Sequence, residues 1–291
     1  MSVNLQQFEQ DLTYRMTAPI AEILQDLDSI AAFDRVVEAK LKRFNWMLGI
    51  AIVGIFLSFF LIAFGIGVVT LVVCAVVAIF AGIQRNKYAQ LNVVNYRYEV
   101  LQKILELISR DIDSTEPIIV ILGCNSATHP RKKTETVPHP TRNNWKIDRF
   151  RDMWLQLNGA FLDGTAFSLT ATELTIKQYG WTRSRSGKSK HKSKIKPKGL
   201  QLELSLKCPR RKYAALSVLK QDARDAVKLP TAVELTRLKV TDHRLELATK
   251  TPAWIDASAK NDELYQAITM MFLSLYQILN LARTLTKKAE A

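Results

Sequence analysis

One segment of this chain has residue types and spacing that suggest a function. Its charged residues are Lys and Arg, which points to binding of anions rather than to catalysis. No acidic residue occurs between Lys177 and Glu203, and Lys and Arg are interleaved there with Ser, Gly and His191. The eight basic positions are Arg183, Arg185, Lys188, Lys190, Lys192, Lys194, Lys196 and Lys198. Such a stretch repels itself and buries little apolar surface, so we expect a mobile basic loop between strands.

Three interpretations of this basic segment compete. It can be a solvated hairpin loop with no ligand. It can bind an anionic lipid surface, where each Lys or Arg adds about 1 kcal/mol. It can also bind nucleic acid through counterion release, although Trp181 is the one aromatic residue nearby for base stacking.

No sequence motif for catalysis or for a cofactor is present. The chain has no P-loop, dinucleotide-binding glycine motif, nucleophile elbow or HExxH zinc motif, so we expect a protein that is not an enzyme and binds no cofactor or metal. His129 and His139 each precede a proline and have no ligand spacing to Cys124 or to a carboxylate. The aspartates of the C-terminal part, Asp148, Asp152 and Asp163, are interpreted as surface or turn residues.

The element around which the chain is organised is an uncharged run between Arg43 and Arg85. One helix needs about 20 apolar residues to cross a bilayer, and the segment 46–83 is nearly twice that length. Gly65 and Gly67 provide a place for a reversal. We therefore predict a transmembrane helical hairpin with legs at 46–64 and 68–83. A buried helix pair in a soluble core and a wedge that does not reach the far side are the alternatives.

The charges flanking the run predict its orientation. Lys40, Lys42 and Arg43 precede the first leg, and Arg85 and Lys87 follow the second. Positive residues stay on the cytoplasmic side, so we expect a two-pass protein of a plasma or inner membrane with both termini cytoplasmic. The three scattered cysteines form no CxxC pair, which suits a reducing compartment.

Small residues within the legs suggest close helix packing. Gly54 with Ser58, and Ala78 with Gly82, are spaced as small-xxx-small pairs. No charged residue lies within the run, so the hairpin is interpreted as an anchor. A pore built from oligomerised hairpins is the alternative.

Amphipathic segments flank the hairpin. Apolar residues recur with helical spacing in 20–44 and again in 91–112, and residues 4–16 fit a short helix. The two longer stripes leave the same membrane face, so we expect them to pair as an antiparallel, coiled-coil-like stalk. Packing on the C-terminal domain and homo-oligomerisation are the alternatives.

The C-terminal part carries the excess positive charge and most of the strand patterns. Residues 117–291 hold 31 basic and 15 acidic side chains, whereas the chain as a whole has a formal charge of +14. Alternating apolar residues in 154–161, 165–179, 200–206, 235–240 and 244–248 predict strands, and a periodic stripe from Leu264 to Leu285 predicts a closing helix.

The fold class expected is an α+β membrane protein with five regions. These are N-terminal amphipathic helices (1–45), the hairpin (46–83), an amphipathic helix (84–116), a strand and polar linker (117–144), and a basic, mostly antiparallel β domain closed by a helix (145–291).

This order of parts resembles an uncharacterised group of bacterial two-span membrane proteins. The segments that carry the resemblance are the hairpin 46–83, the stretch NGAFLDGTAFSLTATELTIK, the strand GLQLELSLK and the ending DELYQAITMMFLSLYQILNLARTL. The resemblance implies the same architecture and assigns no activity or functional residues.

The function expected from the sequence is a membrane-anchored scaffold or adaptor. Its basic C-terminal domain would bind an anionic lipid surface or a protein partner. An oligomeric channel or transport subunit and a membrane-tethered nucleic-acid binder are the alternatives.

Overall fold

The fold is described from a computed structural model. It describes residues 5–61, 65–183, 187–220, 222–252 and 257–290. The chain divides into two compact units. Within the described residues, one comprises 5–12 and 26–95, and the other comprises 13–25 and 96–290.

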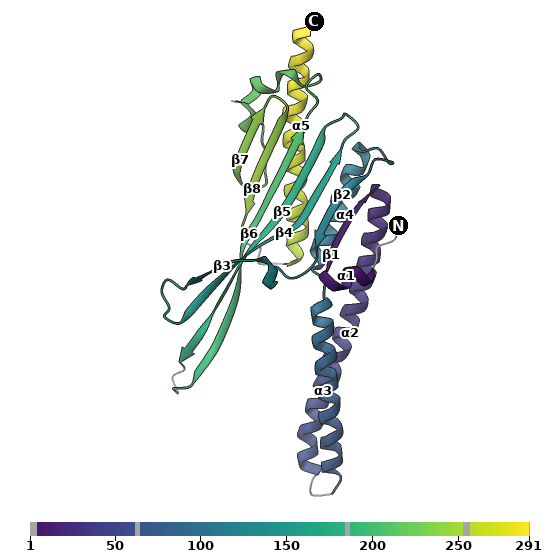
Figure 1. Cartoon of the computed structure of the whole chain (residues 1–291), viewed down its shortest axis with the longest axis vertical. Coiled ribbons are helices and arrows are strands. Elements are labelled where there is room, and N and C mark those ends of the chain that lie inside the picture. The colour runs from purple at the N-terminus through teal and green to yellow at the C-terminus, as the bar shows by residue number, and fades with distance from the viewer. Residues whose placement is uncertain (1–4, 62–64, 184–186, 221, 253–256, 291) are drawn as a thin grey trace. The chain divides into compact units, whose positions relative to one another are not determined.

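The first unit is helical. It holds α1 (Leu5–Asp11), most of α2 (Ile20–Leu61) and α3 (Gly67–Leu91). The α2 and α3 helices run side by side in opposite directions (Figure 1). Gly65 lies between them with φ +74°, a conformation that glycine adopts without steric cost. The predicted reversal at Gly65–Gly67 agrees with these helix ends, while the predicted end of the first leg, 62–64, lies outside the described residues.

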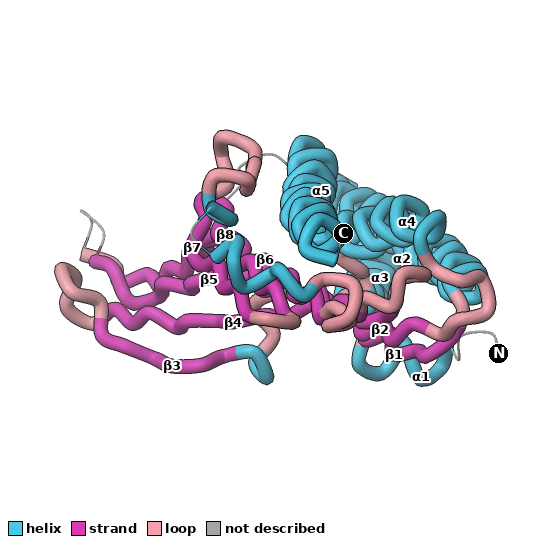
Figure 2. Tube along the Cα trace, turned by 90° about the horizontal axis from the view of Figure 1, so that it is seen from above, coloured by secondary structure: helices cyan, strands magenta, loops and turns pink. Residues whose placement is uncertain are grey.

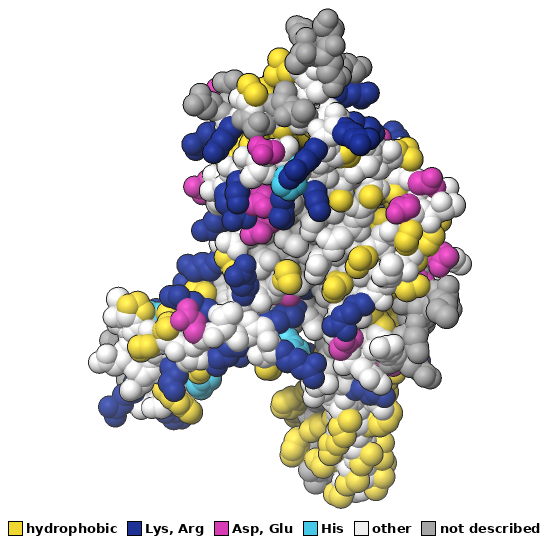
Figure 3. Space-filling view, turned by 45° about the horizontal axis from the view of Figure 1, so that its top comes forward, with side chains coloured by type: hydrophobic (Ala, Val, Ile, Leu, Met, Phe, Trp, Pro, Cys, Tyr) yellow, Lys and Arg dark blue, Asp and Glu magenta, His cyan; other side chains and the backbone are white. Residues whose placement is uncertain are grey.

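Contacts along the helical pair come from small and aromatic residues. A Cβ at Gly54 would lie 2.6 Å from the Sγ of Cys74, so the two helices approach closely there. The rings of Phe44 and Tyr88 stack with centroids 5.6 Å apart. The outer faces are apolar and exposed, and Figure 3 shows hydrophobic side chains covering the end of the pair.

Three helical stretches are long and apolar enough to cross a membrane. They are Ile20–Leu61, Gly67–Asp111 and Asn261–Thr286. In the first two, 11% of the most apolar window is buried in the protein, against 50% in the third. Packing within the protein therefore accounts for much of the apolar surface of the third stretch, whereas that of the first two faces outward. The sequence predicted two such stretches, and the third was assigned there to a closing helix.

The second unit is built on an eight-stranded antiparallel sheet. Its order is β1-β2-β4-β5-β6-β8-β7, and β3 pairs with β4 outside this path. The strands are β1 (Thr13–Ala18), β2 (Ile118–Gly123), β3 (Lys133–Pro138), β4 (Trp145–Ala160), β5 (Ala166–Arg183), β6 (Ser189–Lys207), β7 (Glu234–Thr241) and β8 (Arg244–Thr251). The expected α+β class with a mostly antiparallel sheet and a C-terminal helix is confirmed at this level.

The central strands continue beyond the main sheet. The N-terminal half of β4, the C-terminal half of β5 and the N-terminal half of β6 form an extension with β3, which Figure 1 shows projecting from the sheet. The pairing of β5 with β6 shifts between Leu174 and Thr175, opposite Gly199. Gly199 has φ +119°, and a Cβ there would overlap the carbonyl oxygen of Thr251. A glycine is thus required where the extension begins.

Two helices cover the same side of the sheet (Figure 2). They are α4 (Asn95–Ile108), followed by η2 (Ser109–Asp111), and α5 (Ala257–Glu290). The shorter 3-10 turns are η3 (Pro130–Lys132), η4 (Ala214–Lys220) and η5 (Asp222–Arg224). Leu101, Leu157 and Leu275 are among the fully buried residues of this unit, so its core lies between the sheet and these helices.

Four local predictions differ from the structure. Residues 133–138, expected in a polar linker, form β3 and pair with β4. Residues 13–16, expected in a helix, lie in β1, where each pairs with a residue of β2 from Gly123 to Val120. The helix expected to continue across 84–116 is interrupted at 92–94, so α3 and α4 are separate helices. Residues 96–112, expected in a stalk, group with the sheet unit, which is the alternative in which this stripe packs on the C-terminal domain.

Candidate anion-binding surface

The basic segment forms strands rather than a mobile loop. Arg183 ends β5, and residues 189–198 form the first half of β6. The expectation of a loop is therefore wrong for these residues, because backbone pairing with β5 runs without a gap from Lys190–Thr182 to Lys196–Ile176. Lys188 is exposed in the turn, and Arg185 lies outside the described residues.

Strand geometry orders the lysines. Side chains at alternate positions point to the same face, so Lys190, Lys192, Lys194 and Lys196 share one face of β6. Their spacing along the strand is about 6.6 Å, twice the rise of one residue. Lys190, Lys192 and Lys194 are exposed, Lys196 is half-buried, and Lys198 is exposed at the bulge. The charges are thus held in a row.

The opposite face of the same ribbon carries exposed aromatic and apolar groups together with Lys177 and Arg183. Trp181 and Ile195 are 60% and 54% exposed. The ring of His191 lies 5.5 Å from that of Trp181 and 6.1 Å from that of Tyr179. We call the ribbon formed by 175–183 and 189–197 the basic hairpin. It combines a row of cations on one face with exposed apolar groups on the other.

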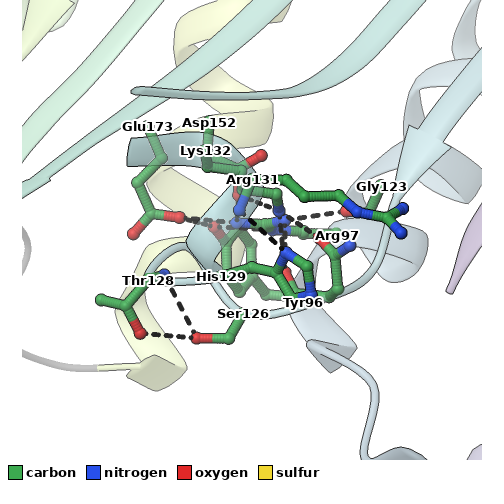
Figure 4. A network of polar contacts seen from close by, with 11 residues as sticks. Tyr96, Arg97, Gly123, Ser126, Thr128, His129, Arg131, Lys132, Asp152 and Glu173 are labelled. Carbon is green, nitrogen blue, oxygen red and sulfur yellow. Dashed lines mark hydrogen bonds and ion pairs between the residues drawn. The ribbon is translucent and has the colours of Figure 1, made fainter. Parts of the chain in front are cut away.

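A second cluster of charges lies at the start of α4 and was not predicted from the sequence. Arg97 is fully buried, and its Nη2 lies 2.7 Å from Oδ2 of Asp152 and 2.9 Å from Oε2 of Glu173. Lys132 Nζ lies 2.8 Å from the same oxygen of Asp152. These four charged groups, shown in Figure 4, form the buried ion cluster.

Neutral groups complete the coordination of the Arg97 guanidinium. Its Nη1 donates to the carbonyl oxygens of Gly123 at 2.8 Å and Asn125 at 3.1 Å. The hydroxyl of Tyr96 donates to Glu173 at 2.8 Å. The guanidinium carbon also lies 5.4 Å from the ring centroid of Trp154.

The buried ion cluster joins several elements rather than presenting a reactive group. Arg97 comes from α4, Asp152 from β4, Glu173 from β5 and Lys132 from η3. Burial lowers the pKa of Lys132, against the opposing effect of its ion pair with Asp152. Positive and negative groups are equal in number, so the arrangement fits a structural role that fixes α4 on the sheet.

The aspartates interpreted as surface or turn residues have different environments. Asp152 is buried in the ion cluster, so that interpretation is wrong for it. Asp148 is also buried, and its Oδ1 accepts from Thr136 at 2.7 Å and lies 3.0 Å from Lys133 Nζ. Asp163 lies in the turn between β4 and β5, as interpreted, and accepts a bond from the backbone N–H of Thr165 at 2.8 Å.

Of the two residue pairs predicted to pack the helices together, only the pair Gly54 and Ser58 lies at a close helix contact. Ser58 is buried and donates to the carbonyl oxygen of Gly54 at 2.7 Å, one turn away. Ala78 is half-buried, and a Cβ at Gly82 would meet nothing within 4 Å. Ala81, which the sequence did not single out, is fully buried instead. The close approach of α2 and α3 is therefore centred on Gly54.

The histidines have neighbours of their own. His129 accepts from the backbone N–H of Arg131, and the ring of His139 lies 6.2 Å from that of Trp145. Among the described residues, no group of three or more His, Cys, Asp or Glu side chains is placed to hold a metal ion.

The chain was compared with protein families, curated proteins and solved structures. None of them matches this chain.

Proposed function

We propose that this chain is a membrane-anchored, non-enzymatic protein whose basic hairpin binds an anionic phospholipid surface. The helical pair α2–α3 is the anchor, inserted as a two-span hairpin with both ends in the cytoplasm. The observation that carries the proposal is the basic hairpin, in which four lysines in a row are backed by exposed Trp181 and Ile195.

Electrostatics supports this choice of ligand. Lysines near an anionic leaflet add about 1 kcal/mol each, so the four on one face of β6 provide about 4 kcal/mol. The attraction acts within a Debye length of about 8 Å at physiological salt, so the lysines must lie close to the lipid.

The apolar face supports the same ligand. Trp is enriched at membrane–water interfaces, and exposed Trp181 and Ile195 offer groups that enter the headgroup region. The lysine row lies on the other face of the ribbon, so the hairpin would meet the bilayer along its edge, with the lysine side chains extending their charged ends toward phosphates. A row of lysines without exposed apolar groups beside it would bind any other polyanion equally well.

The test places a reporter on the basic hairpin of the full chain. A polarity-sensitive fluorophore is attached to Ser189→Cys in a Cys74→Ala background, and the protein is reconstituted into nanodiscs that contain spin-labelled lipid. We expect quenching with phosphatidylglycerol, little quenching with neutral lipid, and loss of quenching in high salt. Equal quenching with neutral lipid would refute the proposal.

A matched pair of variants separates the row from overall charge. Replacing the four lysines of the row, Lys190, Lys192, Lys194 and Lys196, by Glu should abolish quenching. Replacing four exposed lysines elsewhere in the same unit by Glu changes the net charge equally and should leave most of the quenching. The control positions are Lys207, Lys220, Lys239 and Lys250. If both variants lose quenching alike, net charge rather than the hairpin is responsible.

A further inference from the structure

A cavity of about 340 Å³ lies in the sheet unit, away from the basic hairpin. It is formed where the end of α4, the turn between β4 and β5, and the middle of α5 meet. Its lining residues include Leu107, Ile108, Phe161, Leu162, Phe272 and Leu273. The volume falls within the range of about 300–1,000 Å³ that is usual for small-molecule sites.

Aromatic rings form much of the wall. The ring of Phe161 lies 5.5 Å from that of Tyr276 and 6.2 Å from that of Phe272, in both cases edge to face. Leu162 and Leu273 are 67% and 63% exposed and lie on the same lining. The lining thus combines packed aromatic side chains with accessible aliphatic groups.

The charged residues of the lining are acidic. Asp111 and Asp163 both line the cavity, and none of the described residues that line it is basic. The backbone N–H of Leu162 donates to the carbonyl oxygen of Asp111 at 2.9 Å, which ties the two aspartate-bearing segments together. Lys212 bonds nearby, but to the main-chain oxygen of Asp163, at 2.7 Å.

The carboxylate of Asp163 accepts three hydrogen bonds from neighbouring groups. They come from the N–H and hydroxyl of Thr165 and, at 2.8 Å, from the hydroxyl of Tyr213. Burial, together with this carboxylate, raises the pKa of Tyr213 to about 12, and burial raises the pKa of the Cys208 thiol to about 12 as well. Tyr213 and Cys208 are therefore neutral at physiological pH, and the cation beside Asp163 is Lys212, which bonds to its main-chain oxygen.

Thr269 and Tyr276 are the hydroxyl-bearing residues of the lining. The Oγ1 of Thr269 on α5 is buried and makes no hydrogen bond within the described residues. Because this atom is shielded from the cavity, the polar groups that the lining presents to a ligand are those of Asp111, Asp163 and Tyr276.

From these features we infer that the cavity binds an organic ammonium ion with a small hydrocarbon or aromatic body. Cations bind over aromatic faces, and carboxylates complement the positive charge, whereas an anionic ligand would meet Asp111 and Asp163. The aliphatic residues Leu107, Leu162 and Leu273 would contact the hydrocarbon part. The inference uses none of the residues of the lipid-binding proposal and does not depend on it.

The experiment titrates the full chain, in nanodiscs free of choline lipid, with benzyltrimethylammonium and follows binding by calorimetry. Benzenesulfonate and benzyl alcohol serve as anionic and neutral probes of similar size. We expect saturable binding of the cation and at least roughly fivefold weaker binding of the others. No saturable binding, or equal binding of the sulfonate, would overturn the inference.

Variants at exposed positions locate the site without threatening the fold. Asp111→Asn should weaken binding roughly fivefold, which corresponds to one partly solvated charge pair. Leu273→Arg should weaken it further by placing a cation at the lining. Glu116→Gln, which removes an exposed acid that does not line the cavity, should have no effect. Wild-type binding in Asp111→Asn would place the cation elsewhere.

The same ammonium chemistry is carried by phosphatidylcholine headgroups as well as by free amines. Repeating the titration in phosphatidylcholine nanodiscs distinguishes the two sources. A lower apparent affinity there would assign the cavity to the lipid headgroup, and an unchanged affinity would assign it to a free ligand.

Discussion

At the scale of single residues, Arg97 is bound on several sides at once. It is fully buried, pairs with Asp152 and Glu173, and donates to two backbone carbonyls. A buried ion pair contributes little relative to apolar residues of equal volume, but removing one partner leaves an uncompensated charge. The energetic importance of Arg97 therefore lies in what its loss would expose.

We expect Arg97→Met to lower the free energy of unfolding by about 3–5 kcal/mol, because Asp152 would keep its burial and lose one of its two cations. Thermal unfolding in detergent measures the change. The matched control is Lys103→Met, whose ion pair with Asp262 is exposed and worth at most about 1 kcal/mol. Equal shifts in the two variants would mean that the buried ion cluster has no special role.

A double variant examines the same idea more closely. Adding Asp152→Leu to Arg97→Met removes the unpaired carboxylate and should recover part of the lost stability. The coupling between the two sites should amount to about 0.5–3 kcal/mol. Purely additive losses would show that Arg97 acts through packing instead.

The buried ion cluster also shows why sequence reasoning missed it. Its members come from four elements separated by long stretches of chain, and the meeting of Asp152 with Glu173 depends on the register of β4 against β5. Each of these residues is of a charged type that usually lies on the protein surface. Asp152 was accordingly interpreted as exposed, because nothing local distinguishes it.

At the scale of elements, the sequence contained a strand signal for the basic hairpin, and that signal was misinterpreted as a loop. Positions 188, 190, 192, 194, 196 and 198 are all Lys, which is a period of two. That period places one side-chain type on one strand face, but the density of charge was taken as a signal of disorder. The strands at 200–206 and 244–248 were predicted correctly, because their apolar residues alternate against polar ones.

Gly199 is the point at which the basic hairpin leaves the main sheet. We expect Gly199→Ala to destabilise the protein by about 1–3 kcal/mol, because the residue has φ +119° and its Cβ would overlap the carbonyl of Thr251. The measurement is again thermal unfolding.

Gly187→Ala is the control for this prediction. Gly187 also has a positive φ, of +79°, but a Cβ there has open space, so the cost should be smaller. A larger loss in Gly187→Ala than in Gly199→Ala would contradict the steric argument.

At the scale of the whole molecule, the proposed topology puts the beginning of α2 and the basic hairpin in one compartment. The prediction is that Asp28→Cys and Lys190→Cys react with a membrane-impermeant thiol reagent from the same side of sealed vesicles. Both positions are exposed, and the native Cys124 and Cys208 are buried. Ile66→Cys, beside the reversal, should react from the other side if the hairpin spans fully.

Labelling of Asp28→Cys and Lys190→Cys from opposite sides would remove the two-span anchor from the proposal. The two long apolar helices of this anchor could be predicted from the sequence, because an uncharged run of this length is rare outside membrane-spanning segments. The grouping of 96–112 with the sheet could not be predicted, because an amphipathic stripe does not identify its partner.

The β8 strand covers only part of the length of β6. It pairs with β6 only at Leu200–Lys207, so the half of β6 that carries the lysine row is a free edge within the described sheet. An unpaired strand edge can form backbone hydrogen bonds with the same edge of a second molecule. Lysines on that edge oppose this pairing because their charges repel each other. Salt weakens both this repulsion and the attraction to lipid, so conditions that release the hairpin from a bilayer also favour stacking of one molecule on the next.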